Sequence, residues 1–193
     1  KYPITYLNFT HRINQLSNLL LEKGIQRGDR IAVLLHNCPQ YLETFFSLSK
    51  IGAILVPLNW RLAGPELEFI IKDSGSRLLI FEPEFESVVA SLRSNLSLPN
   101  GDYLVVGDPC PDWAISYEKA ISSQPSSDPS SNHSIGGEDP HIIMYTSGTT
   151  GIPKGAVLSH RKTFFNVLNA DMVYHLTSKD IMIVSRPMFH SGG

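Results

Sequence analysis

Short apolar runs alternate with helical segments over the first 106 residues, and this alternation most constrains the fold. The apolar runs are rich in Val, Ile and Leu and comprise residues 31–35, 53–56, 78–81 and 103–106. The helical segments between them comprise residues 39–51, 65–73 and 85–96. Such alternation predicts a parallel sheet whose crossover helices cover its faces. Near-continuous apolar strands agree, because a parallel sheet is buried on both sides. The predicted fold class is therefore α/β, with a mostly parallel sheet and helices on both faces.

The two ends of this pattern add further expected elements. Residues 4–7 suggest a short strand, and a stripe of apolar side chains at helical spacing follows it before Gly24. Near the other end, Ser159 is a suitable N-cap for a helix. That helix is expected to bury a row of apolar side chains at Phe164, Leu168, Met172 and Leu176. Residues 180–184 are expected to form one more strand.

Ser, Pro, Asn and Gly dominate residues 122–137, where apolar side chains nearly vanish. This composition predicts a long surface loop or linker. It separates a first group of strand–helix units, residues 1–121, from a second segment, residues 138–193. The sequence leaves open whether the loop divides two packing units or emerges from one.

Composition narrows the classes of function. The chain has 193 residues, of which 42% are hydrophobic and 18% charged, so it can bury a sizeable core. A net charge of −2 gives no polycation for nucleic acid. The longest apolar run, near residues 51–58, is too short to cross a bilayer, and no signal peptide opens the chain. Cys38 and Cys110 lack metal-site spacing and favour a reducing, cytoplasmic location.

The stretch 145–155 carries the clearest chemistry in the sequence. It reads Tyr-Thr-Ser-Gly-Thr-Thr-Gly-Ile-Pro-Lys-Gly and combines closely spaced hydroxyls with glycines and Lys154. Successive backbone N–H groups in such a loop can form a concave anion site, and the lysine adds a positive charge. An apolar run at 142–145 precedes it, and a helix is expected from about His160. A loop between strand and helix is where open α/β sheets bind ligands, so a polyphosphate site is predicted here.

Better-known loops do not fit this stretch. A Walker A loop needs Gly-Lys-Ser/Thr, whereas Lys154 lies between Pro153 and Gly155. The Gly-x-Gly-x-x-Gly fingerprint is absent here, and Ser147 lacks the flanking glycines of a nucleophile elbow. A hydrolase that uses Ser147 with His160 or His190 is therefore disfavoured. A plain Ser/Gly surface linker remains as the unspecific alternative.

A second motif, residues 187–193, reads Pro-Met-Phe-His-Ser-Gly-Gly and follows the strand expected at 180–184. If that strand is parallel to its neighbours, the motif shares a crevice with the phosphate loop. His190 could then orient a carboxylate or donate a hydrogen bond to a developing acyl phosphate.

Residues 145–155 resemble the phosphate-binding signature of the AMP-forming superfamily of acyl- and aryl-CoA synthetases, luciferases and peptide-synthetase adenylation domains. Residues 187–192 resemble the next motif of the same superfamily. Weaker resemblance to the N-terminal half of acyl-CoA synthetases runs through residues 14–16, 28–32 and 52–59. The chain is thus identified, by resemblance, as a partial N-terminal AMP-binding domain covering residues 1–193.

The resemblance implies a carboxylic acid activated by ATP to an acyl-adenylate, followed by transfer to coenzyme A. It assigns the β- and γ-phosphates to Thr146, Ser147, Gly148, Thr149, Thr150 and Gly151, with Lys154 as an additional charge. It also implies that the Thr146 hydroxyl helps ligate Mg²⁺ and that His190 lies beside the acyl carboxylate. His190 favours a CoA ligase over an amino-acid adenylation domain.

The resemblance also implies that important parts of the enzyme lie outside this sequence. The later acidic Mg²⁺ ligand, the ribose-binding Asp and the C-terminal catalytic Lys are not found in it. Because the sequence starts at Lys1 and ends just after a motif, we expect a longer parent protein and an inactive fragment. The alternative from another class is a nucleotide-binding module without catalysis.

Overall fold

The computed structural model describes residues 3–130, 134–146 and 152–190. Seven strands form one sheet in the order β5-β4-β3-β1-β2-β6-β7. The strands are β1 (Arg30–Leu34), β2 (Ile54–Pro57), β3 (Leu78–Phe81), β4 (Tyr103–Val105), β5 (Ile115–Ser116), β6 (Pro140–Thr146) and β7 (Lys154–Ser159). All neighbouring strands pair in parallel except β6 and β7, which are antiparallel. The predicted α/β class with a mostly parallel sheet is confirmed.

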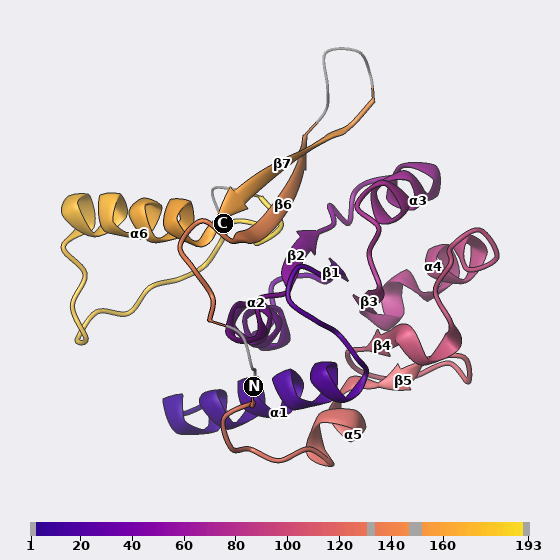
Figure 1. The fold of residues 1–193 in the computed structure, drawn as a ribbon, viewed down its shortest axis with the longest axis horizontal. Helices are drawn as coiled ribbons and strands as arrows, with labels where there is room; N and C mark the ends of the chain where they lie inside the picture. Colours follow the sequence, from indigo (N-terminus) through magenta and orange to yellow (C-terminus); the bar gives the residue numbers. More distant parts are fainter. Residues whose placement is uncertain (1–2, 131–133, 147–151, 191–193) are drawn as a thin grey trace.

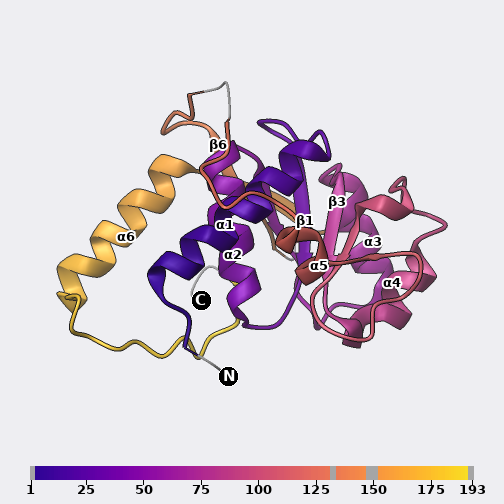
Figure 2. The same ribbon diagram turned by 90° about the horizontal axis from the view of Figure 1, so that it is seen from below.

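Helices cover both faces of this sheet (Figures 1 and 2). The helices of the described residues are α1 (Tyr6–Glu22), α2 (Pro39–Ile51), α3 (Gly64–Asp73), α4 (Glu86–Leu92), α5 (Tyr117–Ser122) and α6 (His160–Tyr174), with 3-10 turns η1 (Pro83–Phe85) and η2 (Asn100–Asp102), and α1 to α5 pack on the sheet. Side chains of α1, α2 and α5 share one core cluster with one face of the strands, and those of α3 and α4 share a second cluster with the other face. Alternate strand residues such as Val33 and Leu34 enter opposite clusters.

Local sequence signals explain where the best-predicted elements begin and end. Pro39 opens α2, where the lack of an N–H costs nothing. Gly52 ends the helix at φ 72°, a left-handed conformation that favours glycine. Strand β3 has the predicted bounds, while the helix expected at 85–96 is a 3-10 turn followed by the shorter α4.

The strand expected at residues 4–7 is wrong, because the chain already enters α1 at Tyr6. Thr5 caps this helix, and its hydroxyl accepts a hydrogen bond of 3.1 Å from the Asn8 backbone N–H. A local capping interaction thus overrides the apolar β-type pattern of a very short segment. The short elements β5 and α5 were not predicted.

The polar stretch 122–137 runs along α1 where it is described. The side-chain amide of Asn14 donates to the Ser126 carbonyl at 2.8 Å, and that of Asn18 donates to Pro125 and Ser127 at 2.9 and 3.1 Å. The segments before and after this stretch belong to one sheet, because β6 pairs with β2.

Two expectations for the last 35 residues are wrong. Residues 180–184 form no strand, and Ile181 and Ile183 are 95% and 86% exposed. Helix α6 begins at the predicted Ser159 cap, but none of its residues is buried, and Phe164 and Met172 are exposed. In both ribbon views α6 stands apart from the other helices (Figures 1 and 2). Its apolar side chains therefore lie outside the two core clusters.

The search for a helix long and apolar enough to cross a membrane found none among the described residues.

Candidate functional site

The predicted phosphate loop joins two antiparallel strands and does not lead from a strand into a helix. Strand β7 was missed, and it lies between the loop and α6. In the β6–β7 hairpin Thr146 is opposite Lys154, and Tyr145 is opposite Gly155. Figure 1 shows the hairpin projecting beyond the rest of the sheet. The described ends of the predicted loop, Thr146 and Lys154, therefore lie at the open end of a two-stranded arm.

Close packing inside the hairpin explains one of the glycines. A Cβ on Gly155 would lie 2.8 Å from Ile143 Cγ2, closer than packed atoms allow, and 3.1 Å from Tyr145 Cζ, where the ring would have to shift slightly. The Tyr145 ring cannot easily move away, because its hydroxyl donates a 2.6 Å hydrogen bond to Asp73 Oδ2 in α3. This hydrogen bond ties the arm to α3, so Gly155 has a packing role in addition to any role in the loop.

Replacing Gly155 with alanine is expected to lower the free energy of unfolding by about 1–3 kcal/mol, because the added methyl overpacks the hairpin. Chemical denaturation of the purified variant measures this loss. Gly136→Ala is the matched control, since the nearest atom to its Cβ would be 3.9 Å away. Equal stability of the Gly155→Ala variant and the wild-type protein would contradict the packing argument.

Of the predicted phosphate-binding residues, the structure describes Thr146 and Lys154. Both side chains are exposed at the open end of the hairpin, where a hydroxyl and an ammonium group lie on directly opposed residues. The other candidates lie outside the described residues: Ser147, Gly148, Thr149, Thr150 and Gly151. Their roles remain predictions.

His190 lies in a short turn and lines a cavity of about 650 Å³. Its backbone N–H donates to the Pro187 carbonyl at 3.1 Å, which closes the turn. Apolar side chains of the sheet and of α2 form one part of the cavity wall, including Tyr41, Phe45, Ile142 and Met144. Helix α6 forms the other part and contributes charged and polar side chains, including Arg161, Lys162 and Asn166. Thr146 follows two residues after Met144 and so belongs to the same face of β6. The structure thus places His190 on the face of the hairpin that carries Thr146, without bringing Thr146 or Lys154 into the cavity wall.

His160, the other histidine weighed for a hydrolase, lies at the far end of β7. It lies six positions after Lys154 along the strand, or ~20 Å at about 3.3 Å per residue. Its ring stacks on His141 at 4.2 Å. The structure therefore does not bring His160 to the end of the hairpin where Ser147 is attached.

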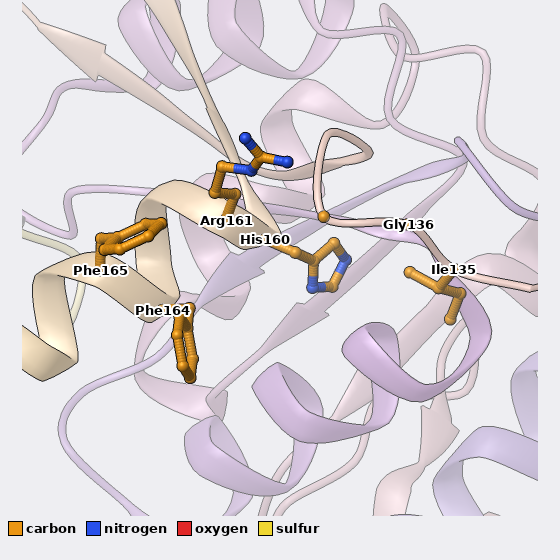
Figure 3. Close-up of a pocket in the computed structure, with 7 residues that line it drawn as sticks. Ile135, Gly136, His160, Arg161, Phe164 and Phe165 are labelled. Atoms are coloured by element: carbon orange, nitrogen blue, oxygen red, sulfur yellow. The ribbon is translucent and has the colours of Figure 1, made fainter.

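A second cavity of about 540 Å³ opens between the start of α6 and the glycine pair at 136–137 (Figure 3). His160, Arg161 and Phe164 line it. His160 Nε2 is a buried atom without a hydrogen-bond partner. Among the predicted site residues that the structure describes, only His160 lines this cavity.

His141 is an unpredicted buried histidine that joins β6 to two helices. Its Nε2 lies 2.6 Å from Ser49 Oγ in α2, and its Nδ1 lies 3.1 Å from Thr163 Oγ1 in α6. The side chain is 3% exposed. Burial lowers the pKa of His141 to about 4, and the charge of His160 contributes in the same direction.

This lowered pKa predicts acid sensitivity. Below pH 6.5 the unfolded chain binds a proton at His141 that the folded protein takes up only near pH 4. Protonation of His141 therefore does not lower the free energy of unfolding above about pH 6.5. As the pH drops towards 4, it lowers this free energy by on the order of 1 kcal/mol per pH unit. Urea denaturation across this range measures the slope. His141→Gln should flatten it, whereas His175→Gln, at an exposed position, should not. An unchanged slope in His141→Gln would exclude His141 as the source.

Comparison with known proteins assigns the chain to a family of enzymes. The family model of AMP-binding enzymes matches residues 1–193. The chain is 36% identical over 190 residues to a feruloyl-CoA synthase from Amycolatopsis sp., covering 97% of this chain and 35% of the relative. It is 34% identical to an indoleacetate–CoA ligase from Aromatoleum aromaticum, covering 98% and 36%.

A solved structure agrees. The inhibitor-bound N-terminal domain of FACL13 from Mycobacterium tuberculosis superimposes with a TM-score of 0.84 at 30% identity, covering 97% of this chain and 45% of that one. The chain therefore belongs to the AMP-binding enzyme family, as its sequence motifs predicted. It spans about a third of the length of the curated relatives it matches.

Proposed function

We propose that this chain is the N-terminal part of an ATP-dependent, AMP-forming acyl-CoA ligase. In this reaction a carboxylate oxygen attacks the α-phosphorus of ATP, and pyrophosphate leaves. The CoA thiolate then attacks the acyl carbon of the adenylate, and AMP leaves. The observation that carries the proposal is the family match over all 193 residues, together with relatives that are CoA ligases. A cytoplasmic location is part of the proposal and is supported by two free thiols, Cys38 and Cys110.

The arm of the hairpin suits the phosphates of ATP. Phosphoryl transfer needs positioning and charge neutralisation more than covalent chemistry from the protein. Thr146 and Lys154 present a hydroxyl and a positive charge on opposed residues, a donor set that matches phosphate oxygens. We assign the residues between them, Ser147, Gly148, Thr149, Thr150 and Gly151, to the same role.

Mg²⁺, when bound with ATP, would neutralise charge on the phosphate oxygens. Thr146 offers one neutral oxygen ligand at the end of β6. Among the described residues there is no group of three or more His, Cys, Asp and Glu side chains that could hold a metal ion. This fits a Mg²⁺ ion that takes most of its ligands from phosphates and water, as is usual for this ion. Thr146 would orient the ion and its nucleotide.

We place the carboxylic acid at the cavity lined by His190. The apolar side chains of Tyr41, Phe45 and Met144 would cover the body of the acid, and the His190 imidazole would donate a hydrogen bond to its carboxylate. The alternative is an adenylation domain for amino acids, from another branch of the superfamily. An amino-acid substrate would need a partner for its α-ammonium group, and the described residues of this cavity offer no carboxylate for it. The cavity lining contains no Asp or Glu among the described residues.

The complete protein tests this function directly. It is incubated with ATP, Mg²⁺ and CoA, and with ferulate, indoleacetate or decanoate in turn. The expected result is AMP and pyrophosphate formation that requires both the acid and CoA for sustained turnover. Formation of ADP, or AMP release that is independent of every acid, would overturn the proposal in favour of another nucleotide-binding function.

We further propose that residues 1–193 alone do not form an acyl-adenylate, because the resemblance assigns the catalytic Lys and the ribose site to later parts of the enzyme. Acid-dependent exchange of labelled pyrophosphate into ATP by these 193 residues would contradict this. ATP binding without exchange would agree with it.

A further inference from the structure

The turn that carries His190 is held by the loop between β1 and α2. Asn37 in this loop uses both ends of its side-chain amide. Its Oδ1 accepts a hydrogen bond of 2.9 Å from the Met188 backbone N–H, and its Nδ2 donates one of 2.7 Å to the Arg186 carbonyl. A carboxamide carries a donor and an acceptor on one planar group, so Asn37 can pair with both backbone groups at once.

Tyr41 in the first turn of α2 adds a third hydrogen bond. Its hydroxyl donates to the Met188 carbonyl at 3.0 Å. The side chain is only 3% exposed, and burial raises the pKa of Tyr41, so the hydroxyl stays protonated and remains a donor. Both backbone polar groups of Met188 are therefore fixed by side chains that lie 151 and 147 residues earlier in the chain.

Side-chain packing holds the same turn from two directions. Met188 packs against the core cluster shared by α1, α2 and α5. The Phe189 ring meets the Trp60 ring edge to face, with centroids 6.0 Å apart and planes at 88°. Trp60 in turn packs against the cluster shared by α3 and α4. The turn is thus tied to both layers of the domain directly before His190.

We propose that Asn37 and Tyr41 are positioning residues that hold the His190 turn in place at its cavity. The consequence for catalysis rests on the proposed function, in which His190 contacts the acid. Tyr41 lines that cavity itself, whereas Asn37 lines a separate apolar groove with Cys38 and Val184. Asn37 therefore acts on the cavity through the backbone of the turn, and it is the better residue for a test.

The first experiment measures the turn itself by hydrogen exchange in the complete protein. Asn37→Leu removes these two hydrogen bonds, and a longer one of 3.4 Å to the Val184 carbonyl, at similar side-chain size. Loss of one such bond should speed exchange of the Met188 amide about fivefold. Asn18→Leu is the matched control, because it likewise removes hydrogen bonds from a side-chain amide to a loop backbone, in this case at Pro125 and Ser127. Unchanged exchange over residues 186–190 in Asn37→Leu would overturn the positioning role.

The second experiment is a double-mutant cycle on kcat/KM for whichever of ferulate, indoleacetate and decanoate the complete enzyme uses. Asn37→Leu alone is expected to lower this value about tenfold. In a His190→Ala background the same change should cost less than about twofold, because the positioned group is gone. Asn18→Leu should leave kcat/KM unchanged in both backgrounds.

The outcomes separate the two claims. Losses that multiply in the double variant overturn the positioning role and leave the role of His190 standing. Wild-type kinetics in His190→Ala overturn the role proposed for His190, and the exchange experiment then decides the structural part alone. If Asn37→Leu does not fold, Tyr41→Phe takes its place in both experiments. This change removes a single hydroxyl and with it one hydrogen bond to the turn. One such bond contributes about 1 kcal/mol, so the expected effect in each measurement is about a fivefold change.

Discussion

Replacing Lys154 with alanine is expected to lower kcat/KM for ATP in the complete enzyme about 10- to 100-fold, with little change in stability. Lys154 is exposed at the open end of the β6–β7 hairpin, opposite Thr146. A hydrogen bond from a charged donor to a phosphate contributes about 1.5–3 kcal/mol, which sets this range. Pyrophosphate release at varied ATP and saturating acid measures the loss.

The control for this prediction is Lys119→Ala. Lys119 is also exposed, but it lies on α5, at the opposite end of the sheet order from the hairpin. Its replacement removes the same charge from the protein and should leave the ATP dependence unchanged. Equal ATP dependence in Lys154→Ala and Lys119→Ala would refute the assignment of Lys154 to the phosphates. A large loss of stability in Lys154→Ala would show instead that the residue supports the hairpin.

The parallel part of the sheet could be predicted because its strands carry their own signals. Each of β1 to β4 is a short, mainly apolar run, and its apolar residues are buried on both faces of the sheet. Pro39 and Gly52 mark the ends of α2 through backbone restrictions that depend on no distant residue. Where the chain itself fixes the conformation, the sequence is sufficient.

The β6–β7 hairpin could be predicted only in half. β6 has two buried residues, His141 and Ile142, but β7 is largely exposed, and its Gly155 and Ala156 are poor strand formers. Its strand conformation comes from pairing with β6 and from the Tyr145 ring over Gly155. Pairing with a specific partner is a property of two segments, and periodicity within one segment does not report it.

The failure at the end of the chain has a related cause. The i, i+4 row of α6 correctly indicates a helix with apolar side chains, and Ser159 correctly marks its start. A periodic row does not specify which surface covers it, and none of the helix residues is buried here. The β-rich run at 181–184 likewise needs a neighbouring strand, and the structure gives it none.

For the candidate site, the sequence identified the residues with unusual chemistry and missed those that position them. Hydroxyls, glycines and Lys154 in one short stretch stand out by type alone, and so does His190 within its motif. Asn37 is an ordinary asparagine before a helix, and nothing near it indicates a contact 151 residues away. Such contacts follow from the crossover topology, which brings the β1–α2 loop to the turn after residue 186.

Replacing Glu43 with alanine is expected to cause the largest loss of stability, about 3–5 kcal/mol. Glu43 in α2 is fully buried and accepts hydrogen bonds of 2.6 and 3.0 Å from Arg12 in α1. It also accepts one of 2.8 Å from the hydroxyl of the buried Tyr117 in α5. Burial and the charge of Glu43 raise the pKa of Tyr117, so the phenol stays a donor. One carboxylate thus joins three helices, and its removal leaves their donors unpaired.

The neighbouring Glu118 tests whether burial, and not merely the presence of an ion pair, decides how much a carboxylate contributes to stability. It also pairs with Arg12, at 2.8 Å, but its side chain is 48% exposed. Water can replace it, so Glu118→Ala is expected to cost less than about 1 kcal/mol. Urea denaturation of both variants measures the difference, and Glu43→Gln, which keeps the shape and loses the charge, should fall between them. Similar losses for Glu43→Ala and Glu118→Ala would mean that burial does not decide the strength of this network.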